Sequence, residues 1–440
     1  MTTSTWSSAL RAARPEHTGV VQAVRGLGVE VRGVTGAVGD RVRIDTTSGR
    51  AVDAEIVAID GASARCMPLS RLDGITARAR VRHAGAPLQV PTGRGLLGRV
   101  LDGLGRPIDG LGPLPRTAPL VPLDHDAPSV ITRRRIDRQL GLGVRVLDTM
   151  TPVGSGQRLG LFAGSGVGKS SLMSMIARGS SADVTVIALV GERGREVREF
   201  LEDDLGPEGL ARSVVVVATS DQPAMARLRS AFVATRIAEQ FRDDGLDVVL
   251  MMDSLTRVAM AQREIGLSAG EPPATRGYPP STFSVLARLL ERAGTGETGS
   301  ITGLYTVLVD GDDHNEPIAD AARGILDGHV VLDRALAIRG HFPAVDVLGS
   351  VSRVVSKITT PDQRQQAVTL RSVLAARRSA NDLIDIGAYR QGANPLVDAA
   401  LEHEPEIARF LTQPMDDLST VGDSWQRLTA LTSEFGGLTS

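Results

Sequence analysis

Residues 163–170 have the sequence Ala163-Gly164-Ser165-Gly166-Val167-Gly168-Lys169-Ser170, and they stand between an apolar run and a stretch of helical character. This order of strand, loop and helix is the context that a nucleotide-binding phosphate loop requires. The glycines let several backbone N–H groups converge on phosphate oxygens, and the helix that follows adds its positive N-terminal end. The strict pattern begins with glycine where this chain has Ala163, a change that the loop tolerates if that residue does not need a positive φ. The octapeptide therefore predicts a phosphate-binding loop.

The side chains of this loop have separate expected tasks. Lys169 would neutralise the β- and γ-phosphates, and the Ser170 hydroxyl would bind Mg²⁺. Contacts to the nucleotide are expected from the whole loop and the first helical turn, namely Gly164, Ser165, Gly166, Val167, Gly168, Lys169, Ser170 and Ser171. A phosphate loop alone indicates only a nucleotide, so the metal and water chemistry must come from elsewhere in the chain.

Two carboxylates follow apolar runs downstream of the loop. The run at 248–252 ends in Asp253, where a Walker-B aspartate would hold Mg²⁺ through water; the alternative is an acidic cap on the next helix. The run at 184–190 is followed by Glu192, which would polarise the attacking water if it faces the nucleotide. Taken without family context, a charged turn of this kind is more often simply solvated.

The hydrophobic pattern outlines three regions. Apolar runs at 159–163, 184–190, 214–218, 248–252 and 301–309 each lead into a helical stretch. They are typical of strands buried on both faces of a parallel sheet, and their alternation with helices predicts a doubly wound α/β domain. Short segments punctuated by glycine before residue 85 predict a small barrel or sandwich. A Gly/Pro-rich stretch around 101–128 predicts loop or linker, and helical spacing after about residue 354 predicts a helical domain.

Composition limits the class of protein. Lys plus Arg (49) nearly balances Asp plus Glu (51), so there is no overall field to collect polyanions, and nucleic acid is not favoured as a partner. The single cysteine, Cys66, is expected to be a small buried side chain. The first twenty residues lack a signal-peptide core and no run of about 18 apolar residues occurs, which predicts a cytoplasmic protein. The run Arg133-Arg134-Arg135 is too short for a nucleic-acid surface and is expected to be solvated.

Further motifs carry a resemblance to a known family. The chain resembles the catalytic subunits of flagellar and type III secretion ATPases, themselves similar to the catalytic subunit of rotary ATP synthases. The resemblance covers most of the chain and is strongest from about 140 to about 360. Beyond the phosphate loop it rests on Gly191-Glu192-Arg193-Gly194-Arg195-Glu196-Val197, Met252-Asp253-Ser254-Leu255-Thr256-Arg257, the proline-rich segment 270–280, Glu316-Pro317-Ile318-Ala319-Asp320 and Gly324-Ile325-Leu326-Asp327-Gly328-His329.

The resemblance implies roles for particular residues. Glu192 would activate the hydrolytic water, while Arg193 and Arg257 match positions that contact the phosphate region. Arg353, in Ser350-Val351-Ser352-Arg353, matches an arginine finger that reaches the neighbouring subunit's site, where a guanidinium stabilises transition-state charge. Phe342 would pack on adenine where relatives often carry Tyr, and Tyr389 is a candidate for the opposite wall.

The resemblance also implies an architecture and partners. We expect an N-terminal tail at 1–18, a β-barrel domain at 19–85, a RecA-like ATPase domain at 86–353 and a C-terminal helical domain at 354–440. A homohexameric ring would hydrolyse ATP with Mg²⁺ to energise protein export through a flagellar or other type III secretion apparatus. Expected partners are a central stalk, export substrates and chaperones, and a stator-like regulator on the tail, for which Trp6 is a suitable anchor. The ring would associate peripherally with the export gate of the inner membrane.

Two other functions remain open from the residues. A ring-shaped nucleic-acid translocase could use the same nucleotide domain, but aromatic residues make up only 3% of the chain and basic stripes are lacking. A non-catalytic nucleotide-binding subunit would not need Glu192 together with Lys169 and Asp253. Stimulation of hydrolysis by single-stranded nucleic acid would favour the first, and ATP binding without turnover the second.

Overall fold

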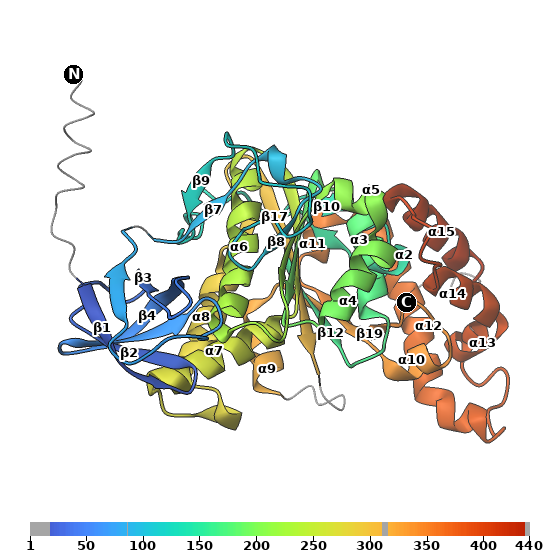
Figure 1. Ribbon diagram of the computed structural model, residues 1–440. Coiled ribbons are helices and arrows are strands. Elements are labelled where there is room, and N and C mark those ends of the chain that lie inside the picture. Colours follow the sequence, from blue (N-terminus) through green and yellow to red (C-terminus); the bar gives the residue numbers. More distant parts are fainter. Residues whose placement is uncertain (1–17, 86, 310–315, 436–440) are drawn as a thin grey trace.

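The computed structural model describes residues 18–85, 87–309 and 316–435. A β-barrel occupies one end of the molecule, an α/β domain the middle and a group of helices the other end (Figure 1). The expected fold class, a RecA-like α/β domain between a small barrel and a helical domain, is confirmed. Trp6 and the rest of the tail at 1–17 lie outside the described residues. In the described ranges no helix combines the length and the apolar character needed to cross a bilayer.

The N-terminal barrel is closed by pairing between its first and last strands. The strands are β1 (Thr18–Arg25), β2 (Gly28–Arg32), β3 (Arg41–Ile44), β4 (Val52–Asp60), β5 (Ser63–Pro68) and β6 (Arg80–His83), in the order β1-β2-β5-β4-β3-β6. Alternate valines and isoleucines fill the interior, and Cys66 is buried among them. A bidentate ion pair between Glu55 of β4 and Arg229 of α6 (Ala224–Asp243), both buried, joins the barrel to the α/β domain.

The α/β domain is built on one sheet of nine strands. Its order is β19-β18-β12-β17-β15-β13-β14-β8, with β16 paired to β17. The strands are β8 (Val100–Asp102), β12 (Arg158–Ala163), β13 (Val184–Val190), β14 (Ser213–Ala218), β15 (Asp247–Asp253), β16 (Gly294–Thr295), β17 (Ser300–Leu308), β18 (Gly328–Leu332) and β19 (Val345–Ser352). All five apolar runs singled out in the sequence are strands of this sheet. The prediction of loop around 101–102 is wrong for β8, which extends the sheet beside β14.

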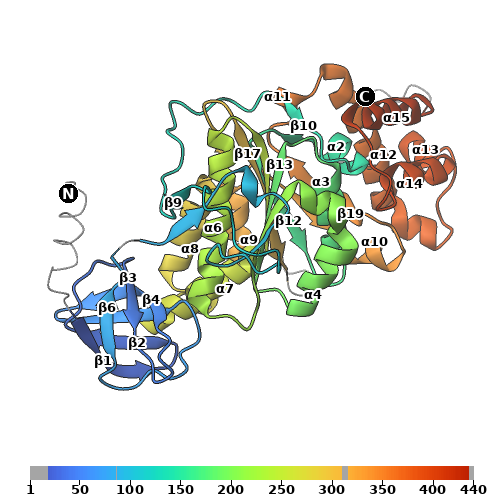
Figure 2. The same ribbon diagram turned by 45° about the horizontal axis from the view of Figure 1, so that its top comes forward.

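Helices cover both faces of this sheet (Figures 1 and 2). One face packs against α6, α7 (Leu255–Ala269), α8 (Pro280–Glu291) and α9 (Pro317–Ile325), and the other against α2 (Arg145–Met150), α3 (Lys169–Gly179) and η2 (Phe200–Leu205). Adjacent residues of one strand therefore pack into different hydrophobic cores. In β12, Phe162 packs on the side of α6 to α9, and Leu161 packs on the side of α2, α3 and η2. This two-sided burial explains why the strands are apolar without alternation.

Strand direction separates two edges of the sheet. Except for the short β16, the strands from β12 to β18 are parallel, so the phosphate loop, Glu192 and Asp253 follow strand ends at one edge. β19 is antiparallel to β18, with Gly328 opposite Ser352. The end of β19, and Arg353 after it, therefore lie at the opposite edge, where β18 begins.

The C-terminal region is helical, as predicted. It contains α12 (Pro361–Asp385), α13 (Pro395–Glu402), α14 (Glu404–Leu411) and α15 (Val421–Ser433). A capping box between Thr360 and Gln363 begins α12. Buried Arg145 of α2 donates to the carbonyls of residues 409, 410 and 412 and pairs with Asp417, which joins this region to the sheet domain.

The remaining elements are short. They are the strand pairs β7 (Gln89–Pro91) with β9 (Leu120–Pro122) and β10 (Gln139–Leu140) with β11 (Val153–Gly154), the turns η1 (Arg94–Leu96) and η3 (Thr275–Gly277), and the helices α4 (Gly194–Glu199), α5 (Gly206–Ala211), α10 (Arg334–Ile338) and α11 (Val355–Ile358).

Candidate active site

The phosphate loop connects β12 directly to α3. β12 ends at Ala163 and α3 begins at Lys169, so the intervening loop is short and glycine-rich. Gly168 has φ +84°, and a Cβ atom there would stand 3.2 Å from the Phe342 ring. Glycine is thus needed at this position both for its backbone conformation and for the approach of the aromatic ring. The Ser170 side chain is exposed at the first turn of α3.

Three charged side chains meet at the start of α3. Lys169 Nζ lies 2.5 Å from Asp253 Oδ1 and 3.8 Å from Glu192 Oε1. All three side chains are largely buried, with exposed fractions of 14%, 6% and 15%. Each comes from a different strand end, of β12, β15 and β13. The structure therefore brings together the ammonium and the two carboxylates on which the sequence argument depended.

Asp253 does not serve as a helix cap. Ser254 occupies the N-cap position of α7 and its hydroxyl accepts from the backbone N–H of Arg257 at 3.3 Å. The helix-capping role that the sequence left open for Asp253 is therefore taken by Ser254. The Asp253 carboxylate is directed instead to Lys169.

Thr306 of β17 is a member of this cluster that sequence reasoning missed. Its fully buried hydroxyl donates to Asp253 Oδ1 at 2.7 Å, the same oxygen that Lys169 contacts. The register of β15 and β17 pairs Met252 with Tyr305, which sets Asp253 beside Thr306. Two donors therefore converge on Oδ1 and leave the second oxygen, Oδ2, for another partner.

The carboxyl group of Glu192 has a raised pKa. Burial, and next the negative charge of Asp253, raise the pKa of Glu192 to about 7, while Lys169 acts in the opposite direction. A carboxyl group that titrates near neutral pH is suited to accept a proton from water. The solvated turn that the sequence alone favoured is thus not what the structure shows for Glu192.

The two arginines expected near the phosphates differ. Gly191 has φ +73°, and a Cβ there would stand 3.0 Å from the Arg257 Cβ, so the turn before Glu192 packs closely on Arg257. The buried Nε of Arg257 has no hydrogen-bond partner among the described residues, which suits a contact with phosphate. Arg193 is 81% exposed, and its one ion pair within the described ranges is with Glu196, at 3.5 Å.

The two aromatic candidates also differ. Phe342 lies against the phosphate loop at Gly168 and remains 44% exposed, so a face is free for a base. The hydroxyl of Tyr389 donates to Asp398 at 2.9 Å and contacts the Asn394 carbonyl at 3.1 Å. These bonds hold the turn between α12 and α13, and among the described residues the Tyr389 hydroxyl contacts only this turn and the start of α13. The structure therefore does not bring Tyr389 to the nucleotide site.

Arg353 is exposed, and it lies apart from the charged cluster around Lys169. Its backbone N–H donates to the Asp327 carbonyl at 3.0 Å, and its Nη2 contacts the Arg323 carbonyl at 3.3 Å. It lies at the sheet edge opposite the phosphate loop, as the direction of β19 requires. Arg353 therefore cannot act on the site of its own chain without rearrangement.

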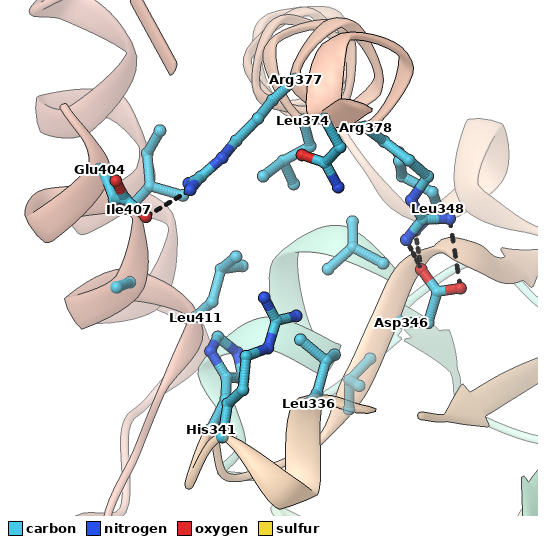
Figure 3. A pocket seen from close by; sticks show the side chains of 15 residues that line it. Leu336, His341, Asp346, Leu348, Leu374, Arg377, Arg378, Glu404, Ile407 and Leu411 are labelled. Carbon is cyan, nitrogen blue, oxygen red and sulfur yellow. Dashed lines mark hydrogen bonds and ion pairs between the residues drawn. The ribbon is translucent and has the colours of Figure 1, made fainter. Parts of the chain in front are cut away.

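A hollow of about 320 Å³ lies between the segment that carries Phe342 and the C-terminal helices (Figure 3). Two ion pairs cross it: Arg378 of α12 with Asp346 of β19, at 2.6 Å, and Arg377 of α12 with Glu404 of α14. Phe342 O also accepts from the Gln413 N–H at 2.9 Å. The backbone of Phe342, the expected adenine contact, is thus hydrogen-bonded to the segment that follows α14.

Comparison with known proteins agrees with this geometry. Residues 143–352 match the model of the ATP synthase alpha/beta family, nucleotide-binding domain, and residues 359–430 match the T3SS EscN ATPase C-terminal domain. The chain is 52% identical over 416 residues to a flagellum-specific ATP synthase of Bacillus subtilis, covering 94% of this chain and 95% of the relative. It is 49% identical over 417 residues to a type 3 secretion system ATPase of Xanthomonas euvesicatoria, covering 94% of each.

Solved structures show the same relationship. The assembled ATPase EscN from the type III secretion system of enteropathogenic E. coli has a TM-score of 0.88 and 40% identity, over 94% of this chain and all of that one. EscN in complex with its central stalk EscO has a TM-score of 0.87 and 41% identity, with the same coverage.

Proposed function

We propose roles for the site residues from one premise: this chain belongs to the family of flagellar and type III secretion ATPases, within the ATP synthase alpha/beta family, and hydrolyses ATP to energise protein export. The observation that carries the proposal is the convergence of Lys169, Asp253 and Glu192 at one edge of the sheet. An ammonium and two carboxylates in one largely buried cluster match what γ-phosphate hydrolysis needs: charge neutralisation, metal binding and a proton acceptor.

Glu192 is the proton acceptor. Water attacks the γ-phosphorus while the Glu192 carboxylate takes its proton, and the bond from that phosphorus to the β,γ-bridging oxygen breaks, releasing ADP and phosphate. Lys169 contacts the β- and γ-phosphates through its ammonium, and Arg257 offers its unpartnered Nε to the same region. The backbone N–H groups of residues 164–168 hold the phosphates in line for attack.

Magnesium is the proposed cofactor, and the residues present fit it. The free oxygen of Asp253, left by the convergence of Lys169 and Thr306 on Oδ1, and the exposed Ser170 hydroxyl supply hard oxygen ligands. When bound, the ion supplies charge neutralisation to the phosphates. Thr306 acts as a positioning residue, since its hydroxyl orients the Asp253 carboxylate.

Arg353 acts in a neighbouring copy of the chain, in a homohexameric ring. Its place at the sheet edge opposite the phosphate loop supports this, because a head-to-tail arrangement brings the two edges together. The guanidinium then stabilises transition-state charge only where two copies meet. Phe342 stacks on the adenine. Arg193 and Tyr389 receive less support: the first is exposed and the second is held within the helical region.

We further propose that the ring acts in the cytoplasm, at the inner-membrane export gate, with a central stalk and export substrates and chaperones as partners. The support for a stalk is the likeness to EscN, which has been solved with its central stalk EscO. A stator-like regulator would bind the N-terminal tail.

A pair of variants tests the proposed chemistry. Glu192→Gln keeps the shape of the side chain and removes the proton acceptor, so it should bind ATP normally and release phosphate at less than about a hundredth of the wild-type rate. Lys169→Ala should weaken nucleotide binding itself. Binding is measured with a fluorescent ATP analogue and turnover by phosphate release. A near-normal rate for Glu192→Gln would assign the water to another residue.

A further inference from the structure

Lysine is nearly absent from this chain. The sequence contains 49 basic residues, and only two of them, Lys169 and Lys357, are lysines. Lys169 belongs to the phosphate loop. Lys357 lies in α11, is exposed, and forms no ion pair or side-chain hydrogen bond with any residue in the described ranges. Lysine differs from arginine in carrying a compact charge on a flexible stem, so Lys357 is distinctive in a chain that otherwise uses arginine.

Lys357 lines a basic hollow of about 560 Å³. The lining includes Arg133, Arg134, Arg135, Arg158 and Lys357, against the acidic Asp137 and Asp327. Three of these arginines already form hydrogen bonds or ion pairs within the chain. Arg133 donates to the carbonyls of Pro128 and Glu291, Arg134 to that of Thr298, and Arg158 pairs with Asp327 and Glu291.

The expectation that residues 133–135 are simply solvated is therefore wrong for Arg133 and incomplete for Arg134, which is exposed but hydrogen-bonded. Arg133 is partly buried and both it and Arg134 fasten their loop to the sheet domain. Arg135 matches the expectation fully: it is exposed, and its side chain forms no hydrogen bond or ion pair within the described ranges. Arg135 and Lys357 thus face the hollow as two uncommitted positive charges.

The hollow lies at the Arg353 edge of the sheet. Asp327, whose carbonyl holds the Arg353 N–H, and Val354, the next residue, both line it. Arg158 at its floor is the first residue of β12, the strand whose other end carries the phosphate loop. The basic hollow and the phosphate loop are therefore at opposite edges of the same sheet.

The phosphate-loop edge carries the opposite charge. Between residues 194 and 211, the segment of α4, η2 and α5 contains six acidic and two basic residues. Five of these carboxylates are exposed: Glu196, Glu199, Glu202, Asp203 and Glu208. The segment begins two residues after Glu192, so it starts beside the site that Arg353 of a neighbouring copy is proposed to enter.

We propose that the basic hollow receives the acidic α4–η2 segment of a second copy of this chain, with Lys357 and Arg135 pairing with its exposed carboxylates. This inference rests on the proposed ring. It adds the charges that bring the Arg353 edge of one copy to the phosphate-loop edge of the next. A surface that meets a different surface of the next copy is heterologous, and such contacts close into rings. Complementary charge at those surfaces fixes their register and speeds their encounter.

The register is consistent with the chain geometry. Lys357 follows Arg353 by four residues and lies in α11, which begins two residues after Arg353. α4 runs for six residues from its start near Glu192, which corresponds to about 9 Å at 1.5 Å per residue. With Arg353 beside the neighbour's Glu192, the flexible stem of Lys357 has carboxylates of α4 and η2 within its range.

Zero-length cross-linking tests the pairing directly. A water-soluble carbodiimide joins an amine to a carboxylate that contacts it, and this chain offers only two lysine amines besides its N-terminus. The assembled full-length chain is mixed from ¹⁵N-labelled and unlabelled copies, so that mass spectrometry identifies bonds between copies. We expect Lys357 to be joined to a carboxylate within 196–208 of another copy. Lys169, 2.5 Å from Asp253 within one chain, serves as the internal positive control.

Charge variants give an independent test by mass photometry and by the dependence of ATPase activity on protein concentration. Lys357→Glu should raise the concentration for half-maximal assembly roughly tenfold. Lys357→Arg should assemble normally while losing the cross-link, and Lys357→Glu combined with Glu199→Lys should restore assembly. Glu199 is preferred to Glu196, which interacts with Glu192. Arg50→Glu, an exposed barrel site with the same change in charge, is the matched control.

The two proposals fail in different ways. If rings form and Arg353→Ala abolishes their activity, but Lys357 is joined to carboxylates elsewhere or to none, the pairing is refuted and the ring stands. The pairing is also refuted if Lys357→Glu assembles like Arg50→Glu. If hydrolysis per chain is independent of concentration and of Arg353, the proposed ring chemistry itself fails.

Discussion

Removing the Thr306 hydroxyl should impair the site without disturbing the fold. Thr306 is fully buried and donates to Asp253 Oδ1 at 2.7 Å. Valine has nearly the same shape and no hydroxyl, so Thr306→Val deletes this hydrogen bond together with the longer contact of the hydroxyl to the Met252 carbonyl, at 3.3 Å. Asp253 would keep Lys169 as its partner only until Lys169 moves to the phosphates. The carboxylate would then be free to turn away from the metal.

The magnitude follows from the kind of bond that is lost. A hydrogen bond to a charged group contributes about 1.5–3 kcal/mol, and each 1.4 kcal/mol is a factor of about ten. We therefore expect kcat/KM for magnesium ATP to fall by about 10- to 150-fold. The concentration of Mg²⁺ needed for half-maximal binding of a fluorescent ADP analogue should also rise, since Thr306 orients Asp253, the proposed metal ligand.

Two controls separate the loss of the hydrogen bond from a loss of packing. Thr306→Ser retains the hydroxyl and should restore most of the activity, and the melting temperature of each variant reports any loss of packing. If Thr306→Val matches the wild type in both kcat/KM and Mg²⁺ dependence, Thr306 does not position Asp253. If Ser and Val variants are equally impaired, the role is one of packing and not of hydrogen bonding.

Further expectations follow for three other residues. Arg353→Ala should bind ATP normally but lose the gain in rate on assembly, about 10³-fold, and an unchanged dependence of rate on protein concentration would refute action in a neighbouring copy. Because the pKa of Glu192 is raised to about 7, this base is protonated below pH 7, so kcat/KM should fall by up to about tenfold per unit of pH below 7. A flat profile from pH 5.5 to 8 would show that Glu192 is not the base. Burial raises the pKa of Asp148 to about 7 from 3.8, so the folded protein binds an extra proton between these values and loses stability as pH rises through that window. The melting temperature of the wild type relative to Asp148→Asn should therefore decrease from pH 5 to pH 8, and a constant difference would contradict this.

The parts of the fold that the sequence predicted are those with local signals. The phosphate loop is recognisable because its glycines, lysine and flanking elements are contiguous. The central strands were found because burial on both faces makes them continuously apolar. β8 was missed because three residues inside a Gly/Pro-rich stretch carry no periodic pattern, and its place depends on pairing with distant β14.

The site was predictable only where residues end a strand. Asp253 directly follows an apolar run, so its position at the loop edge could be inferred from chain order. For Glu192 the residues alone favoured a solvated turn, and its expected role came from the family resemblance. Thr306 could not be found, since it is an apolar-run residue whose contact depends on the register of β15 against β17. Tyr389 was chosen as an aromatic without a neighbouring pattern, and the structure commits its hydroxyl to Asp398. The hydrogen bonds from Arg133 to backbone carbonyls likewise depend on the tertiary fold, so the sequence alone could not predict them.

The most direct measurement is the structure of the assembled Glu192→Gln protein with magnesium ATP. We expect that the Lys169 ammonium has left Asp253 Oδ1 for the β- and γ-phosphates, while Asp253 and Ser170 face the metal. The amide of residue 192 should hold a water in line with the γ-phosphorus, with Arg353 of the next copy on the far side. If residue 192 is turned away from the phosphate, or if Asp253 contacts neither the metal nor its waters, the proposed hydrolysis mechanism is wrong.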